Sequence, residues 1–166
     1  MSVRDEILAA NEQYAAGFQK GDLPMPPGRQ FAVVTCMDAR LDPAKFLGLE
    51  EGDTHVIRNA GGLVTDDALR SLVISYHLLG TREVMVIAHT DCGMLTFQTP
   101  DLQEKLGTDI DFLAFPDLDG SVRASVKRVR DSSLTVDDVS GWVYDVRTGR
   151  LREVAGLRGR RGGRRS

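Results

Sequence analysis

The sequence predicts an α/β fold, a single domain with a central, mostly parallel β-sheet flanked by helices and with a late antiparallel edge strand. Three segments rich in apolar residues, FAVVT, THVIRNA and EVMVIAH, have the composition of buried strands. Segments with helical periodicity separate them, and this alternation is typical of a parallel sheet that helices cover on both faces. A length of 166 residues fits one domain with a substantial core.

The N-terminal segment predicts an amphipathic helix over residues 4–18. Ile7, Tyr14 and Phe18 recur there at helical spacing, together with alanines. The proline-rich run over residues 21–30 should then interrupt regular structure, because each proline fixes φ and lacks a backbone donor.

The first two strands lie on either side of a short helix. Residues 31–35 predict the first strand, and residues 54–60 predict the second. Between them, Asp42 is expected as the N-cap of a helix that has Pro43 in its first turn and ends at Gly48.

The next two elements continue the alternation. Thr65 is expected to cap a helix that Gly80 ends, because apolar residues between them lie at i, i+3, i+4, i+7 and i+10. Residues 83–89 predict the third strand. Residues 98–120 have no regular pattern, and we expect no particular element there.

The C-terminal part predicts one further helix and two short strands. The strands lie within residues 141–154, around a turn at Thr148 and Gly149. The helix is predicted from three valines at helical spacing, Val122, Val126 and Val129. Residues 1–157 therefore form the predicted domain.

Residues 158–166 form an arginine- and glycine-rich tail without an acidic or apolar residue, which we expect to be disordered. The tail holds five of the 21 basic residues, so the remaining 16 stand against 24 acidic ones and the domain is acidic. The domain also lacks the basic stripe of a nucleic-acid binder. We expect the tail to be solvated or to face the acidic domain, and not to bind nucleic acid.

Composition also bears on the compartment. Two cysteines do not make a disulfide framework, and no charged and apolar leader opens the sequence. No apolar run approaches the roughly 20 residues that span a bilayer. We therefore expect a soluble, cytoplasmic protein without membrane insertion.

Both cysteines and one histidine stand at or just beyond the ends of predicted strands. Cys36 follows the first strand, His89 ends the third, and Cys92 lies three positions further. Open parallel sheets bind ligands at the carboxyl ends of strands where strand order reverses, so these side chains should share one crevice. Two thiolates and one imidazole suit a catalytic zinc with an open fourth position. The alternative is a pair of buried, inert cysteines.

Asp38 and Arg40 follow Cys36 at a spacing that can direct all three side chains into one crevice. A carboxylate near zinc can occupy the fourth position or accept a hydrogen bond from bound water, and an arginine can hold it in either arrangement. Without the neighbouring metal ligands, this pair would be interpreted as a solvated surface pair.

Other chemically active side chains receive structural interpretations. His55 lies within the predicted second strand and His77 on the helix after it, and we expect neither to carry protons in a reaction. Trp142 and Tyr144 alternate along a late strand, where core packing or an interface explains them better than a ligand site.

The segments CMDAR, VIRNAGG and HTDCG resemble, in this order, the C-x-D-x-R and H-x-x-C signatures of the beta-class carbonic anhydrases and the segment between them. This resemblance implies a zinc ion held by Cys36, His89 and Cys92, with Asp38 and Arg40 as the catalytic dyad. It also implies a homodimer or a dimer of dimers, with the active site near the subunit boundary and the N-terminal helix reaching across it. No counterpart of the plant-type glutamine precedes the first strand, so that subtype is not assigned.

The implied reaction is the reversible hydration of carbon dioxide to bicarbonate and a proton by a zinc-bound hydroxide. If the site also has a closed state, in which a protein side chain replaces water on the zinc, Asp38 is the expected fourth ligand. Gly61 and Gly62 either let backbone groups approach the substrate or form a tight turn. Two alternatives stay open, a hydrolase of carbon disulfide or carbonyl sulfide on the same fold and a non-catalytic, zinc-stabilised binding module.

Overall fold

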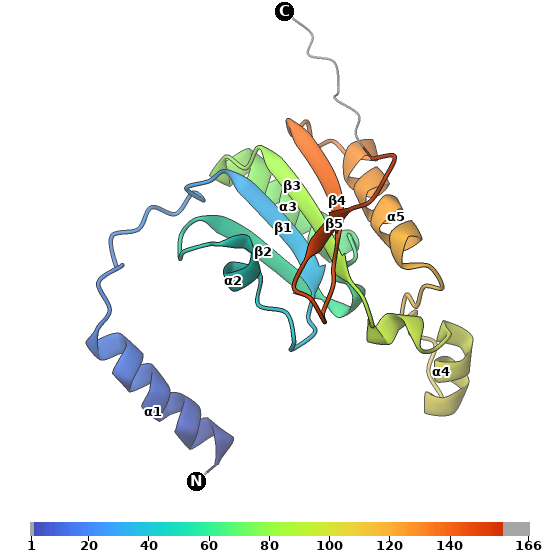
Figure 1. Cartoon of the computed structure of the whole chain (residues 1–166), viewed down its shortest axis with the longest axis horizontal. Helices are drawn as coiled ribbons and strands as arrows, with labels where there is room; N and C mark the ends of the chain where they lie inside the picture. The colour runs from blue at the N-terminus through green and yellow to red at the C-terminus, as the bar shows by residue number, and fades with distance from the viewer. Residues whose placement is uncertain (1, 158–166) are drawn as a thin grey trace, which may run out of the picture.

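A computed structural model describes residues 2–157 of the protein, so the predicted tail lies outside the described residues. Five strands form one sheet in the order β2-β1-β3-β4-β5 (Figure 1), in which β5 is antiparallel to β4 and the other neighbours are parallel. This arrangement confirms the predicted fold class. The strands are β1 (Phe31–Cys36), β2 (Thr54–Asn59), β3 (Glu83–His89), β4 (Asp138–Tyr144) and β5 (Leu151–Glu153).

Helices connect the strands, and two of them cover the same face of the sheet. In Figure 1, α3 lies behind the sheet and α5 lies beside β4. The apolar side chains of both helices join those of β1 and β3 in the main core. The α-helices are α1 (Val3–Ala16), α2 (Pro43–Leu47), α3 (Asp66–Leu79), α4 (Thr99–Leu106) and α5 (Leu118–Asp131). Two 3₁₀ turns, η1 (Ala60–Gly62) and η2 (Gly93–Leu95), follow β2 and β3.

The core lies between the central strands and the two covering helices. Val34 of β1, Val86 of β3, Leu72 of α3 and Val126 of α5 are each at most 1% exposed. Burying a side chain of this size stabilises the fold by about 1.5–3 kcal/mol relative to leaving it in water. This packing holds the carboxyl ends of β1 and β3 in fixed positions.

The predicted helix ends are confirmed. Asp42 and Thr65 each accept a hydrogen bond from a backbone N–H three residues later, as N-caps do. Gly48 and Gly80 end α2 and α3 in the left-handed conformation, with φ of +62° and +77°. Local side-chain chemistry therefore fixes where both crossover helices start and stop.

The first helix forms as predicted, but it does not pack on the sheet. α1 stands apart from the domain on an extended linker (Figure 1), and no residue of the helix is buried by the described part of the chain. Ile7 is 62% exposed and Tyr14 is 54% exposed. The Tyr14 hydroxyl donates to a carboxylate oxygen of Glu51 at 3.2 Å, a contact near the start of β2.

α4 was not predicted from the sequence. It begins with Thr99 and Pro100, ends at Gly107 in the left-handed conformation, and buries none of its own residues. A helix without a buried face needs no apolar periodicity, so the segment lacked the pattern by which helices are recognised.

The histidines and the tryptophan outside the motifs make local contacts. His55 Nδ1 lies 2.7 Å from the Ser75 hydroxyl, and His77 packs edge-on against Tyr76. The Trp142 indole donates to the Ser140 hydroxyl at 2.9 Å. These contacts support the structural interpretation of these three side chains.

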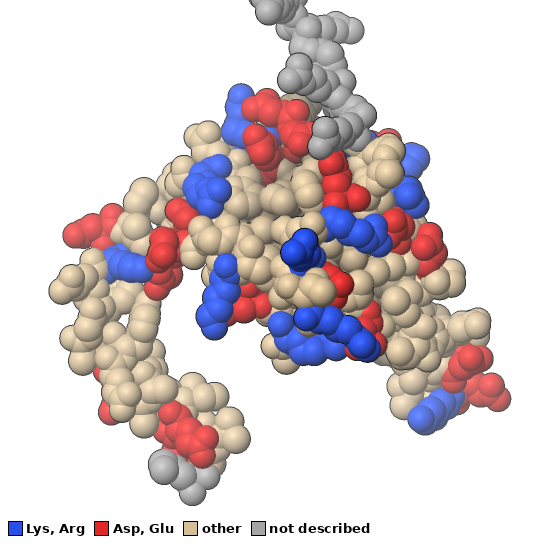
Figure 2. All heavy atoms as spheres, viewed as in Figure 1, with Lys and Arg blue, Asp and Glu red and all other residues tan. Residues whose placement is uncertain are grey.

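The surface carries both signs of charge. Figure 2 shows acidic and basic side chains interspersed over the face in view, without a continuous basic area among the described residues. None of the helices described by the structure has the length and apolar character needed to cross a membrane.

Candidate metal centre

The strand order places the site where open parallel sheets bind ligands. From β1 the chain passes outward to β2, and it then returns through α3 to the opposite side of β1 as β3. Strand order therefore reverses between β1 and β3. Thr35 pairs with Ile87 across these strands, so Cys36 and His89 end neighbouring strands at the same edge of the sheet.

The structure brings the three expected metal ligands together. The ligand atoms of Cys36, His89 and Cys92 all lie within 4.8 Å of one another. The three residues are 5%, 0% and 2% exposed, and both cysteines are free thiols. Two sulfurs and one nitrogen converging at this range are a donor set that fits tetrahedral zinc.

The hydrogen bonding of His89 also fits a metal ligand. Its Nδ1 lies 2.8 Å from the carbonyl oxygen of Thr90 and donates its proton there, which leaves a lone pair on Nε2. Nε2 is the one buried side-chain nitrogen or oxygen among residues 2–157 without a hydrogen-bond partner. An unpartnered buried polar atom costs about 1–3 kcal/mol. Histidines that bind metals almost always donate their other ring N–H to a carbonyl or carboxylate oxygen, as His89 does here.

The two sulfurs are electrostatically coupled. A hydrogen bond from the Cys92 thiol lowers the pKa of Cys36, and the backbone N–H groups of Asp38 and Gly61 act in the same direction. The same hydrogen bond raises the pKa of Cys92, because the bond is lost when the Cys92 thiol gives up its proton, and burial and repulsion by the negative charge of the Cys36 thiolate act in the same direction. A divalent cation would remove this repulsion, since metal binding favours the deprotonated form of each ligand.

Asp38 and Arg40 form a two-point ion pair beside this cluster. Arg40 donates from Nε to Asp38 Oδ1 at 3.0 Å and from Nη2 to Oδ2 at 2.8 Å. Asp38 Oδ2 also lies 3.7 Å from His89 Nε2, and the carboxylate is only 18% exposed. The Arg40 guanidinium holds the pKa of Asp38 well below its usual range, so the carboxylate faces the ligand cluster as an anion.

Arg58 is a site residue that the sequence reasoning missed. From β2, its Nε donates to the carbonyl oxygen of Cys36 at 2.9 Å, and its Nη2 donates to that of Asp38 at 2.8 Å. Arg58 therefore holds the loop after β1 through two backbone carbonyl groups at its start. The available signal was the position of Arg58 inside VIRNAGG, but nothing local indicates that a strand arginine reaches the neighbouring loop.

The two glycines of η1 lie against the site. Gly61 and Gly62 have φ of +86° and +63°. A Cβ on Gly62 would lie 2.8 Å from the backbone nitrogen of Cys36, closer than a carbon can approach. Gly62 therefore has a close-packing role beside a ligand, whereas the proximity of Gly61 and Gly62 to substrate stays a prediction.

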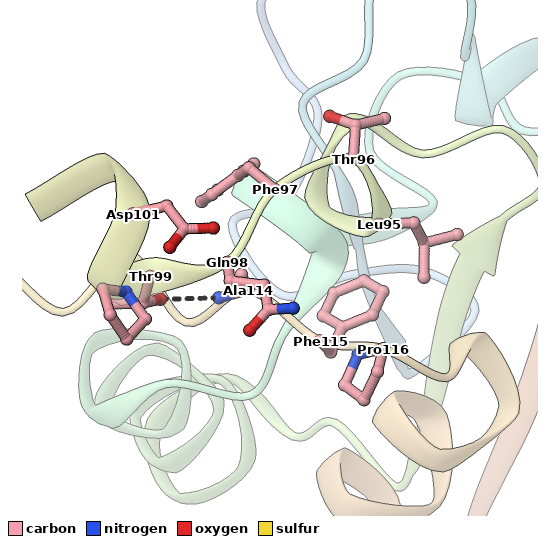
Figure 3. A pocket seen from close by; sticks show the side chains of 10 residues that line it. Leu95, Thr96, Phe97, Gln98, Thr99, Asp101, Ala114, Phe115 and Pro116 are labelled. Atoms are coloured by element: carbon pink, nitrogen blue, oxygen red, sulfur yellow. Dashed lines mark hydrogen bonds between the residues drawn. The ribbon is translucent and has the colours of Figure 1, made fainter. Parts of the chain in front are cut away.

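An apolar wall separates the ligand cluster from a nearby cavity. Met94 and the partly buried Phe115 pack with Cys36 and Cys92 in a second, smaller core. Phe115 also lines a cavity of about 620 Å³ between η2 and α4 (Figure 3). Ala114 and Pro116 also line the cavity, and the Ala114 N–H donates to the Thr99 hydroxyl at 3.3 Å (Figure 3). None of the three metal ligands lines this cavity.

Known proteins share this fold and these motifs. A sequence model of the family described as carbonic anhydrase matches residues 31–113. The chain is 48% identical to beta-carbonic anhydrase 1 of Mycobacterium tuberculosis, over 93% of this chain and 99% of the relative. It is similar to a crystal structure of carbonic anhydrase from Streptococcus mutans, with a TM-score of 0.85 and 47% identity over 93% of this chain and 98% of the other. It is also 33% identical to a carbon disulfide hydrolase of Acidithiobacillus thiooxidans, over 92% of this chain and 90% of the relative.

Proposed function

The chain belongs to the beta-class carbonic anhydrase family, and from this premise we propose that it hydrates carbon dioxide reversibly to bicarbonate and a proton at a zinc site. Cys36, His89 and Cys92 would hold the ion. The observation that carries this proposal is the unpartnered Nε2 of buried His89, which lies within 4.8 Å of two sulfurs. Zinc in such a site lowers the pKa of water and so supplies a nucleophile at neutral pH.

Asp38 is the residue best placed to orient the attacking water. Its carboxylate is deprotonated because Arg40 stabilises the charge, and it faces the ligand cluster at 3.7 Å from His89 Nε2. A fixed acceptor at this point directs one O–H bond of the water toward the protein and a lone pair toward the substrate. Because two thiolate ligands offset the charge of the ion, the reaction should depend strongly on this help.

The surroundings of the cluster suit a small apolar substrate. Met94, Phe115 and Tyr144 pack around the two cysteines and limit the access of bulk water. Carbon dioxide has no charge and no hydrogen-bond donor, so it can enter these apolar surroundings at little cost in free energy. Carbon disulfide is also small and uncharged and could enter the same surroundings, so the substrate preference needs a direct assay.

We also propose a homodimer or a dimer of dimers. α1 exposes Ile7, Leu8 and Tyr14 at 62%, 56% and 54%, and a 14-residue helix without a packed face is marginally stable in water. A second copy of the chain would cover this apolar face.

A cytoplasmic location is proposed because two free thiols that serve as ligands need a reducing compartment.

The test is a stopped-flow assay of carbon dioxide hydration with elemental analysis on the same sample. We expect about one zinc per chain and turnover in proportion to zinc content. Cys92→Ser should lose zinc and turnover together, because a serine hydroxyl does not replace a thiolate ligand at neutral pH. Zinc without hydration would support the non-catalytic module, and faster turnover of carbon disulfide than of carbon dioxide would support the hydrolase.

A further inference from the structure

Arg40 contacts a second carboxylate in addition to Asp38. Its Nη1 donates to Asp91 Oδ2 at 2.9 Å, and its Nη2 donates to the backbone carbonyl oxygen of Asp91 at 2.9 Å. With the contacts from Nε and Nη2 to Asp38, all three guanidinium nitrogens are engaged. Arg40 therefore contacts Asp38 along the edge formed by Nε and Nη2 and Asp91 along the edge formed by Nη1 and Nη2.

Asp91 is placed for this contact by an unusual backbone conformation. It lies between the ligands His89 and Cys92 and has φ of +56°, one of three non-glycine residues with positive φ in the described part of the chain. Aspartate tolerates this left-handed region better than most residues. In this conformation both its carbonyl oxygen and its carboxylate reach Arg40, which ties the loop after β3 to the loop after β1.

We propose that Asp91 is a positioning residue, which holds Arg40 and, through it, the Asp38 carboxylate in the orientation that faces the metal cluster. The inference rests on the role proposed above for Asp38 and Arg40. Arg40 is a long side chain that is 46% exposed, and with Asp38 as its only partner it could leave the site together with that carboxylate. The contacts with the Asp91 carboxylate and carbonyl oxygen oppose this movement because they bind Arg40 to a second loop.

The competing interpretation is a surface ion pair without a catalytic effect. The Asp91 side chain is 66% exposed, and exposed ion pairs contribute little to stability. The two interpretations differ in what the loss of the carboxylate changes. A surface pair affects the free energy of unfolding slightly, whereas a positioning residue lowers kcat while zinc stays bound.

The experiment compares Asp91→Ala and Asp91→Asn with the matched control Asp67→Ala. Asp67 forms an equally short ion pair, 2.8 Å to Arg70, on an exposed helix surface. We expect Asp91→Ala to lower kcat about tenfold at unchanged KM, as the loss of outer contacts around a metal site commonly does. Asp91→Asn keeps one oxygen acceptor and should fall between this variant and the parent enzyme. Asp67→Ala should keep the parent kcat.

Two further measurements separate positioning from folding. Zinc content should stay at the parent level in both Asp91 variants, and a crystal structure of zinc-loaded Asp91→Ala should show the contact between Arg40 and Asp38 altered. Parent-like kcat with that contact intact would overturn the inference, and so would a loss of zinc in proportion to kcat.

The variant Asp38→Asn distinguishes a failure of this inference from a failure of the proposed function. If Asp38→Asn loses turnover and the Asp91 variants do not, the dyad stands and only the role of Asp91 is wrong. If Asp38→Asn also keeps parent turnover, the role proposed for the dyad itself is wrong.

Discussion

Replacing Gly62 by alanine tests how the turn after β2 holds Cys36, a proposed zinc ligand. Gly62 has φ of +63°, and an added Cβ would lie 2.8 Å from the Cys36 backbone nitrogen and 2.9 Å from the Thr35 carbonyl carbon. Both atoms belong to β1, which pairs with strands on both sides. The neighbouring backbone therefore cannot give way without disturbing the sheet, and we expect the turn and Cys36 to move apart.

The expected cost has two parts. Alanine in the left-handed region costs roughly 1–2 kcal/mol. Forcing an extra carbon into a close-packed contact costs about 1–3 kcal/mol more. Gly80→Ala provides the matched control, because Gly80 has φ of +77° and an added Cβ there meets no described atom within 4 Å. The control should show the first cost without the second.

Urea unfolding of both variants measures these costs, with and without a zinc chelator. We expect the free energy of unfolding of Gly62→Ala to lie about 1–3 kcal/mol below that of Gly80→Ala, the part that we assign to overpacking. Zinc affinity should fall in Gly62→Ala and not in Gly80→Ala, because only the former displaces Cys36, a proposed zinc ligand. Equal free energies in the two variants, with full zinc in both, would refute the reasoning.

Three further predictions concern charge and the tail. Arg152 lowers the pKa of Asp119, so this ion pair stabilises the fold at pH values above the unfolded-state pKa of Asp119, and the stabilisation is lost as the pH falls through the folded-state pKa. In urea titrations, Asp119→Asn should lower the free energy of unfolding by at most about 1 kcal/mol at neutral pH, and this difference should vanish in acid. Deleting residues 158–166 should leave the stopped-flow rate within a few fold, and a collapse in rate would contradict the predicted solvated tail. Crystal structures at mildly acidic and alkaline pH test whether Asp38 leaves Arg40 for the metal in acid; an intact pair at both pH values would exclude that switch.

Much of the fold could be predicted because its determinants are local. β1 and β3 are continuous apolar runs, and α3 carries an N-cap at Thr65 and a left-handed glycine at Gly80. The convergence of Cys36 and His89 follows from the same information, since parallel strands with a reversal of order bring their carboxyl ends together. The sequence order of the elements places these two side chains in one crevice if the sheet winds outward from between β1 and β3, and the strand order β2-β1-β3 meets this condition.

The rest depends on contacts between segments that are distant in the sequence. Arg58 and Asp91 act on loops that belong to other strands, and neither has a pattern that would reveal its target. The apolar repeat of α1 predicts a helix, but periodicity does not identify the surface that covers its apolar face. α4 has no fully buried residue, so the segment lacks the strong apolar repeat from which a helix can be predicted.

The charges around the centre explain why these contacts matter for metal binding. The charged groups are two thiols, two carboxylates and two guanidiniums, from Cys36, Cys92, Asp38, Asp91, Arg40 and Arg58. With both thiols deprotonated, these side chains carry a net charge of about −2, which a divalent cation neutralises. Without the cation, two adjacent thiolates in a largely buried site would be costly, so the raised pKa of Cys92 keeps one proton on the pair. Metal binding must then release that proton, and the affinity for zinc should rise with pH for a reason that lies in the ligands themselves.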